Sequence, residues 1–340
     1  MKEIQIGSRP DLRRLRLRSY SAVGVLTDEN TRRHCYPLIA GKLPQHHLFQ
    51  IPSGEDQKTL GTCEKIWQQL TDLRFDRHAV LLLLGGGVIG DMGGFCAATY
   101  KRGIDFVILP TTLLSQVDAS VGGKLGVDFH GLKNHIGVFQ LPRLTVISTD
   151  FLETLPEREL RSGFAEVIKH CLISDATMWG KLKRRKLQSQ NWRTLVKHSV
   201  AFKYRVVSKD PKEKGLRKIL NFGHTIGHAL ETHFLNSGKR IFHGEAIAAG
   251  MMMESSIAVG KKLMSKQEAD EVAGYLIGLF GKLELPDPSQ ILPLVQQDKK
   301  NRGNKILLAL PHGIGKAVWD IPVSPSEIER AMDVYQAFQT

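Results

Sequence analysis

Short apolar runs alternate with helical patterns through the first half of the chain. Strands are predicted at VGVLTD from Val23, AVLLLL from Ala79, DFVILP from Asp105 and LTVIST from Leu144, and the N-terminal segment is interpreted as a further strand and a loop. Between these runs, TLGTCEKIWQQL from Thr59 has the apolar spacing of an amphipathic helix. Strands that alternate with helices are typical of a parallel sheet with helices on its faces.

After about Thr154 the alternation gives way to a succession of helical patterns. Helices are predicted over ERELRSGFAEVIKHCLI, TLVKHSVAFKYRVVS, GHTIGHALETHF and HGEAIAAGMMMESSIAVG, and a short strand returns at KILLAL from Lys305. We interpret the run Met251–Met253 as core packing. The pattern predicts an α/β domain over residues 1–155 and a mostly helical domain over residues 156–340, with a ligand site in the cleft between them.

The stretch LLLLGGGVIGDMGG, from Leu81 to Gly94, is the strongest local signal. Four leucines predict a buried strand, and Gly85, Gly87 and Gly90 have the spacing G-x-G-x-x-G before a helix. A glycine turn and a helix N-terminus present unpaired N–H groups and a favourable dipole to an anion. The stretch therefore predicts a nucleotide site, and a dinucleotide is the expected ligand.

Histidines and a carboxylate in the second half could bind a metal ion. His224 and His228 are four residues apart and would share one face of a helix. His243 opens HGE, and Glu166 belongs to another predicted helix. Two imidazoles and one carboxylate would leave an open coordination position, as in a catalytic zinc site. The alternative is that each histidine is an ordinary core or surface residue, and the spacing does not choose between His224 and His228.

Two glycine-rich segments carry polar residues suited to a phosphate or a polyol. TTLLSQVDASVGGK and HGLKNHIG contain Asp118, Lys124, Lys133 and Asn134. Glycines beside such side chains allow close approach of the backbone to a ligand. An ordinary polar loop would have the same composition.

A third polar segment precedes the first histidine motif. In KEKGLRKILNFGH, Glu213, Arg217 and Asn221 recur every four residues and lead to His224. On a helix they would form one polar stripe that continues into the metal site. A solvated helix face would show the same stripe.

The net charge of +13, from 47 basic and 34 acidic residues, raises the question of an anionic partner. The densest basic run, KLKRRK from Lys181, lies on a predicted helix and is interpreted as a solvated face. Aromatic residues make up only 7% of the chain, and no nucleic-acid-binding module is recognisable. The charge is better explained by attraction of a phosphorylated, carboxylated substrate.

The cysteines and the N-terminus indicate the expected compartment. Cys35, Cys63, Cys96 and Cys171 show no C-x-x-C spacing, so reduced thiols are expected. The N-terminus lacks the apolar core of a signal peptide, and no apolar run is long enough to span a bilayer. We expect a cytoplasmic protein.

Several long motifs, in order, resemble the 3-dehydroquinate synthase family. They are GGGVIGDMGGFCAATYKRGI, PTTLLSQVDASVGGKLGVD, KNHIG, RSGFAEVIKH, LNFGHTIGHALE and HGEAIAAGM, and the similarity runs from about Thr27 to Lys316. The resemblance implies an N-terminal Rossmann-like domain that binds NAD and a helical C-terminal domain, with the active site between them. It also implies conversion of 3-deoxy-D-arabino-heptulosonate 7-phosphate to 3-dehydroquinate and phosphate, through transient oxidation by NAD⁺.

The resemblance also assigns roles to individual residues. Glu166, His224 and His243 match the ligands of a divalent metal, usually zinc, with cobalt as an alternative, and His228 matches a residue near the substrate phosphate. Residues that match polar groups around the oxidised carbon are Asp118, Lys169 and Glu213. Lys203 and Arg217 match the pair that binds the substrate carboxylate. Further substrate contacts match Lys124, Asn134, Asn221 and Lys316, and Arg102 matches a residue that reaches the phosphate from the neighbouring subunit of a homodimer.

For NAD, the resemblance implies contacts spread over several segments. They match Gly86, Gly87, Val88, Asp91, Thr111, Thr112 and Leu114, and more peripherally Asp28, Asn30, Glu55, Lys58, Lys133, Phe151 and Thr154. Asp105 has the spacing of a ribose-binding acid in a generic dinucleotide fold. The family places ribose recognition elsewhere, so Asp105 is set aside.

Three other functions compete with this interpretation. Sugar-phosphate cyclases such as 2-epi-5-epi-valiolone or 2-deoxy-scyllo-inosose synthase act on substrates without a carboxylate. The dehydroquinate synthase pattern, which favours a substrate with a carboxylate, is matched by Lys203, Arg217, Asn221 and His228. A metal-dependent polyol dehydrogenase would share the two-domain plan but release NADH. A basic nucleic-acid-binding protein would bind DNA in a strongly salt-dependent way.

Overall fold

The computed structural model describes residues 4–130, 132–297 and 305–339. The chain forms two compact units, one of residues up to Leu160 together with Trp192–Tyr204, the other of Arg161–Asn191 together with the residues from Arg205 onward. It passes between them within helix α5 (Glu157–Ser174), at the start of helix α7 (Trp192–Lys209) and again within α7.

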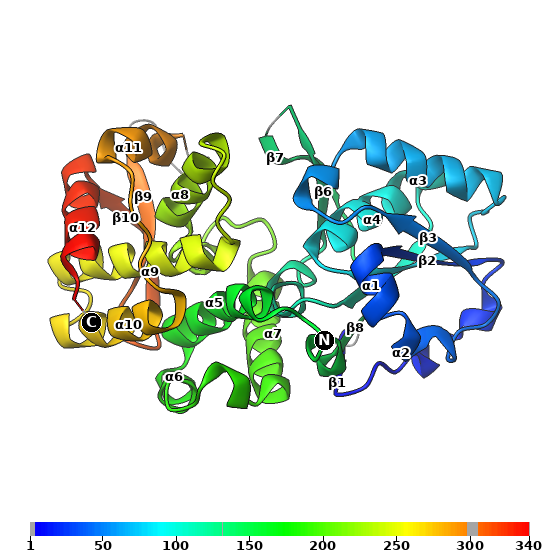
Figure 1. The fold of residues 1–340 in the computed structure, drawn as a ribbon, viewed down its shortest axis with the longest axis horizontal. Coiled ribbons are helices and arrows are strands. Elements are labelled where there is room, and N and C mark those ends of the chain that lie inside the picture. Colours follow the sequence, from blue (N-terminus) through cyan, green and yellow to red (C-terminus); the bar gives the residue numbers. More distant parts are fainter. Residues whose placement is uncertain (1–3, 131, 298–304, 340) are drawn as a thin grey trace. The chain divides into compact units, whose positions relative to one another are not determined.

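The first unit is built on a six-stranded parallel sheet (Figure 1). Its strands are β1 (Ile4–Gly7), β2 (Val23–Asp28), β3 (His47–Ile51), β4 (Val80–Gly85), β5 (Asp105–Pro110) and β8 (Leu144–Ser148), in the order β1-β8-β5-β4-β2-β3. The four strands predicted from apolar runs are confirmed, as is the N-terminal strand. Strand β3 was not predicted, because its five residues, HLFQI, form neither a long apolar run nor a regular alternation of polar and apolar positions.

The apolar strands are buried because both faces of the sheet are covered. Leu81 and Leu83 pack into a core with α3 (Leu60–Asp72) and α4 (Gly87–Thr99). Val80 and Leu82 point to the opposite face, where they pack with the N-terminal leucines, the C-cap residue of α1 (Glu29–His34) and α2 (Pro37–Ala40). Because both faces of β4 are covered, its sequence is a continuous apolar run.

The glycine-rich polar segments form a turn and a hairpin. A short π-helical turn, Ser115–Ala119, contains Asp118 and precedes the antiparallel strands β6 (Lys124–Phe129) and β7 (Leu132–Phe139). Gly126 and Gly137 face each other across this pair, and a Cβ at Gly137 would lie 2.2 Å from the carbonyl oxygen of Leu125. The glycines therefore bring the two strands together.

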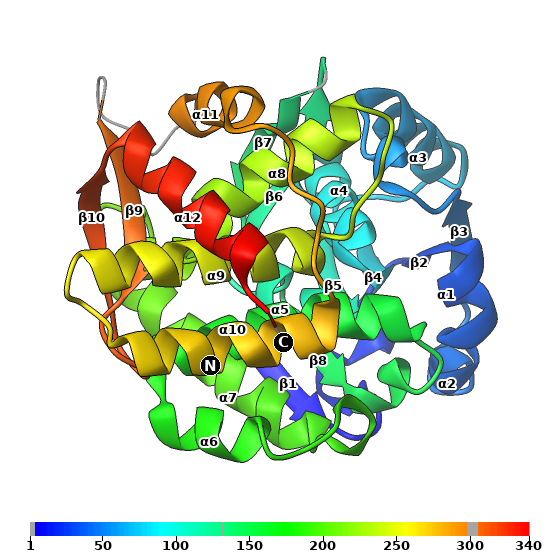
Figure 2. The ribbon, with the colours of Figure 1, turned by 60° about the vertical axis from the view of Figure 1, so that its left-hand side comes forward.

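The second unit is mainly helical, as expected. Its elements are α6 (Ala176–Leu182), a 3₁₀ turn (Leu216–Asn221), α8 (His224–Asn236), α9 (His243–Gly260), α10 (Lys266–Phe280), α11 (Pro288–Gln296), α12 (Pro325–Ala337) and the hairpin β9 (Ile306–Pro311)–β10 (Ala317–Val323). Helix α9 is buried along most of its length and contacts α8, α10, α12 and β9 (Figure 2). Met251, Met252 and Met253 are buried on it, which confirms their role as core residues.

Two predictions that placed polar or basic residues along a helix are wrong. Glu213, Arg217 and Asn221 do not share an α-helix, because a turn at residues 211–215 precedes the 3₁₀ turn and Glu213 has φ 57°. Asp210 causes this turn by accepting hydrogen bonds from the backbone N–H groups of Lys214, Gly215 and Arg217. The basic run from Lys181 lies mostly beyond the end of α6, although most of its charged side chains are exposed as expected.

No helix within the described ranges is both long and apolar enough to cross a lipid bilayer.

Candidate active site

The residues expected to bind the nucleotide follow the carboxyl ends of the parallel strands. Asp28 ends β2 and Asn30 follows it, Glu55 and Lys58 follow β3, and the glycine turn lies at the end of β4. The chain continues from β2 to β3 on one side and through α3 to β4 on the other, so the topology reverses between β2 and β4. In open α/β sheets ligands bind at such a reversal. Thr111, Thr112 and Leu114 follow β5, and Phe151 and Thr154 follow β8.

Not every expected nucleotide contact presents a free side chain. The Asp28 carboxylate caps α1 by accepting from the N–H of Thr31 at 2.7 Å. Phe151 is buried in the core, so a nucleotide would reach its backbone only. Lys133 is exposed on β7. Asp105 begins β5 at the opposite end of the strand and pairs with Arg143 there, which agrees with setting it aside.

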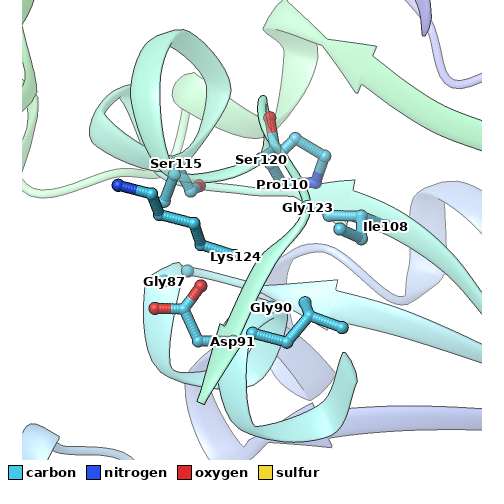
Figure 3. Close-up of a pocket in the computed structure, with 12 residues that line it drawn as sticks. Gly87, Gly90, Asp91, Ile108, Pro110, Ser115, Ser120, Gly123 and Lys124 are labelled. Atoms are coloured by element: carbon cyan, nitrogen blue, oxygen red, sulfur yellow. The ribbon is translucent and has the colours of Figure 1, made fainter. Parts of the chain in front are cut away.

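The glycine turn has the geometry of an anion site. Gly85 ends β4, Gly86 is the N-cap of α4 without a side-chain cap, and Gly87 is the first helical residue. The turn lines a pocket together with Asp91, Ser115 and Lys124, whose side chains Figure 3 draws around it. Uncapped N–H groups beside a lysine favour a phosphate group.

Gly87→Ala should weaken nucleotide binding without unfolding the protein. A Cβ at Gly87 would meet only the Cβ of Ala119, at 4.0 Å, so the methyl group would enter ligand space rather than the core. We expect at least a tenfold rise in the Kd for NAD⁺, measured by calorimetry, with a Tm close to that of the parent. Gly278→Ala, on α10 with nothing within 4 Å, is the control. Unchanged NAD⁺ affinity in Gly87→Ala would remove the turn from the nucleotide site.

A buried lysine joins the hairpin to the glycine-turn helix. Lys58 is 3% exposed, and its Nζ lies 2.7 Å from Oδ2 of Asp91 and 2.5 Å from Oδ1 of Asn134. Burial lowers the pKa of Lys58, but the carboxylates of Asp91 and Glu55 outweigh it and raise that pKa overall. Burial raises the pKa of Asp91 despite the nearby ammonium. Two expected nucleotide contacts and one expected substrate contact therefore form one network.

A second lysine in the first unit holds the π-helical turn. Nζ of Lys203, on α7, lies 2.5 Å from Oδ1 of Asp118 and 2.7 Å from its carbonyl oxygen. Gln116 anchors the same turn by donating from Nε2 to the carbonyl oxygens of Pro110 and Ser148. The structure thus brings together two residues expected at different ends of the substrate. Among the other expected substrate residues of this unit, Arg102 and Lys124 are exposed.

The expected metal ligands converge in the second unit. Oε1 of Glu166, on α5, lies 3.4 Å from Nε2 of His224 and 3.7 Å from Nε2 of His243. These three residues could hold one ion, since each offers a ligand atom within 4.8 Å of the others. His228 is exposed one turn beyond His224, with its ring centroid 5.0 Å from that of His224. His228, Glu231 and His243 form an alternative group of the same size.

Glycines let the three helices that carry the expected metal ligands approach one another. A Cβ at Gly244 would lie 2.2 Å from the carbonyl oxygen of Ser162, where α9 meets α5. A Cβ at Gly250 would lie 2.1 Å from the carbonyl oxygen of Gly223, where α9 meets α8. Backbones this close leave no room for a side chain. The motifs FGHTIGH and HGEAIAAG therefore provide close helix contacts as well as the expected metal ligands.

The donor set fits a divalent cation. His224 and His243 direct Nε2 toward Glu166, while their Nδ1 atoms contact the carbonyl oxygen of Phe222 at 3.1 Å and Oε2 of Glu231 at 3.3 Å. Metal-binding histidines are commonly oriented by such partners of the second ring nitrogen. Both carboxylate oxygens of Glu166 are buried; Oε2 pairs with Lys169, whereas Oε1 has no hydrogen-bond partner among the described residues. Two imidazoles and one carboxylate leave a coordination position for a substrate.

Glu166 of the expected metal site forms an ion pair with a buried lysine. Nζ of Lys169 lies 2.5 Å from Oε2 of Glu166, and both side chains are at most 1% exposed. Burial raises the pKa of Glu166, but Lys169 and His243 hold it below its ordinary value. Burial opposes protonation of His243, yet Glu166 and Glu231 raise its pKa to about 9. A bound cation would take the place of that proton.

The segment before α8 carries the remaining expected substrate contacts. Arg217 is 4% exposed and donates from Nη1 to the carbonyl oxygen of Pro211 at 2.7 Å. Asn221 donates from Nδ2 to Oε1 of Glu213 at 2.7 Å, so these two expected residues lie together although they share no helix. Lys316 is exposed in the turn between β9 and β10. The sequence did not point to Glu231, which contacts α9, or to Glu254, which contacts the start of α8. No residue spacing along the chain indicates such contacts between separate helices.

The architecture and its two sites define a class of protein. An α/β unit with a nucleotide-binding turn, and a helical unit with a three-ligand cation site, are the plan of metal-dependent enzymes that use a dinucleotide. Family models described as the N-terminal and C-terminal parts of 3-dehydroquinate synthase match residues 48–162 and 163–301. The chain belongs to the 3-dehydroquinate synthase family, which confirms the resemblance and the expected fold class.

Known proteins are similar to this chain along most of its length. The 3-dehydroquinate synthase of Campylobacter concisus is 42% identical over 316 residues, 91% of this chain and 89% of that protein. That of Acetivibrio thermocellus is 44% identical over 298 residues, 84% and 82% of the two chains. The structure of 2-epi-5-epi-valiolone synthase from Streptomyces hygroscopicus subsp. jinggangensis, with NAD⁺ and Zn²⁺ bound, matches with a TM-score of 0.87 and 28% identity, covering 98% of this chain and 96% of that one.

Proposed function

We propose that the protein is a carbon–oxygen lyase that converts 3-deoxy-D-arabino-heptulosonate 7-phosphate to 3-dehydroquinate and phosphate. This step belongs to the shikimate pathway, which leads to chorismate and the aromatic amino acids. The cofactors would be NAD⁺ and one divalent cation, Zn²⁺ or Co²⁺. The observation that carries the proposal is the convergence of Glu166, His224 and His243 in a chain that also has an uncapped glycine turn.

The chemistry follows from what an oxidised substrate can do. Oxidation of the C5 hydroxyl by NAD⁺ would acidify the neighbouring C6 proton, and loss of phosphate would follow. NADH would then reduce C5 again, and ring opening with an intramolecular aldol reaction would close the carbocycle. When bound, the cation would polarise the hydroxyl that is oxidised. Around that carbon we place Lys169, Asp118 and Glu213.

Charged side chains would select the two anionic ends of the substrate. Arg217 has a planar guanidinium suited to a carboxylate and, with Lys203, would bind that group. The phosphate and neighbouring hydroxyls would contact Lys124, Asn134, Asn221, His228 and Lys316. Arg102, exposed on its unit, would reach the phosphate from a second copy in a homodimer. We expect the enzyme to act in the cytoplasm.

Substrate choice separates this proposal from related cyclases. A valiolone synthase lacks a substrate carboxylate to bind, whereas Arg217 is a buried cation in this chain. The enzyme, loaded with NAD⁺ and Zn²⁺, should release phosphate from the heptulosonate phosphate and form dehydroquinate. Turnover of sedoheptulose 7-phosphate without formation of dehydroquinate would contradict the proposal. A polyol dehydrogenase would instead release NADH in proportion to the substrate consumed.

A further inference from the structure

Both histidines of the proposed metal site begin a helix. His224 is the first residue of α8 and His243 is the first residue of α9. The N-terminus of a helix carries a partial positive charge of about half an elementary charge. Two such ends at one site disfavour a cation. The site therefore needs something that offsets these charges and still holds the histidines in place.

The N-cap residue of α8 has no side chain that could cap the helix. This residue is Gly223, which has a left-handed backbone (φ 79°). The cap comes instead from Glu254, which lies on α9, eleven residues after His243. Oε2 of Glu254 accepts from the N–H of Gly223 at 2.6 Å, and Oε1 accepts from the N–H of Ile226 at 3.3 Å. One carboxylate thus binds the residues on both sides of His224.

Close packing of α8 against α9 allows the side chain of Glu254 to reach the N-terminus of α8. Gly250, one turn before Glu254 on α9, lies where a Cβ would contact the carbonyl oxygen of Gly223. Glu254 is 0% exposed, so its carboxylate is shielded from bulk solvent and depends on partners in the protein. Helix α9 caps itself differently, because Oε2 of Glu245 accepts from the N–H of Phe242 at 2.9 Å. Each helix that begins with a histidine is therefore capped by a glutamate of α9.

We propose that Glu254 is a positioning residue of the metal centre. Its buried carboxylate fixes the first turn of α8, and with it Nε2 of His224, and its negative charge offsets the positive end of that helix. The inference rests on the proposed function, because it assumes that Glu166, His224 and His243 bind a divalent cation. Glu254 itself acts only through α8.

The test is the affinity of the metal-free full-length protein for Co²⁺, followed by its visible absorption and by competition with a chelator. Glu254→Gln keeps the shape but removes the charge, and its amide cannot accept from both N–H groups. We expect 10- to 100-fold weaker Co²⁺ binding, the range typical of partners that orient metal ligands. The Co²⁺ spectrum should change as well, because the imidazole of His224 loses its fixed orientation.

Met253→Ala is the matched control. Met253 is buried on the same helix, next to Glu254, so its truncation destabilises α9 without removing the cap. It should lower Tm and leave the Co²⁺ affinity of the folded protein unchanged. If Glu254→Gln does not fold, Glu254→Asp, which keeps the charge on a shorter side chain, should show the weaker binding.

The outcomes separate the two proposals. Lower Tm with parental Co²⁺ affinity and spectrum in the Glu254 variant would overturn the positioning role and leave the proposed function intact. Failure of the parent protein to bind Co²⁺ at this site would overturn the metal centre itself and the positioning role with it. Weaker binding in Met253→Ala equal to that in Glu254→Gln would show a general packing effect and also overturn the inference.

Discussion

Glu166→Gln is expected to abolish tight divalent-cation binding and turnover, and to destabilise the protein. The carboxylate is the only anionic member of the proposed ligand set, so its loss removes the charge that attracts the cation. It also removes the partner of Lys169, which is 1% exposed and lies 2.5 Å from Oε2 of Glu166. Breaking a buried ion pair by removing one partner costs about 3–5 kcal/mol.

A second variant separates the two effects of Glu166. In the double variant Glu166→Gln with Lys169→Met, no unpaired ammonium is left in the interior, so much of the lost stability should return. Metal binding should remain absent, because the carboxylate is still missing. Metal content by elemental analysis and urea unfolding measure the two effects. Stoichiometric Zn²⁺ in folded Glu166→Gln would exclude Glu166 as a ligand.

Gly250→Ala is expected to be the most damaging small substitution in the second unit. The added methyl group would lie 2.1 Å from the carbonyl oxygen of Gly223 and 2.9 Å from the backbone nitrogen of Gly227. Both contacts are to backbone, so no side chain can move aside, and α8 must shift away from α9. We expect a loss of about 3 kcal/mol or more, at the upper end of overpacking effects.

Gly260→Ala provides the comparison on the same helix. Gly260 is the last residue of α9, and a Cβ there would meet nothing within 4 Å. It should be neutral or slightly stabilising in urea unfolding, because alanine loses less backbone entropy on folding. Equal stability of the two variants would show that α8 and α9 do not pack as closely as the structure has them.

The parts of the fold that were predicted correctly have strong local patterns. The apolar run of β4 is buried on both faces and is recognisable from composition alone. Strand β7 is mostly exposed and has no regular apolar pattern, and its pairing with β6 shows that it is a strand. The stripe of Glu213, Arg217 and Asn221 fitted a helical period, but Asp210 folds the preceding segment into a turn. A period alone does not exclude such a turn.

The residues of the candidate site could also be predicted only in part from the sequence. The residue types of Glu166, His224 and His243 pointed to a cation, but their spacing left His228 equally possible. Distances in the folded chain favour His224, because its Nε2 faces Glu166 while His228 is exposed. Glu231 and Glu254 could not be predicted, because each acts on another helix and neither has a characteristic spacing.

The central claim is that NAD⁺ is recycled within each turnover, and one assay tests it directly. The Zn²⁺-loaded enzyme is mixed with the heptulosonate phosphate and NAD⁺ at a concentration well below that of the substrate, and phosphate, dehydroquinate and absorbance at the NADH wavelength are recorded together. We predict that phosphate and dehydroquinate form in equal amounts, far in excess of NAD⁺, with no net rise in NADH. Accumulation of NADH that stops the reaction after one equivalent of NAD⁺ would contradict the account.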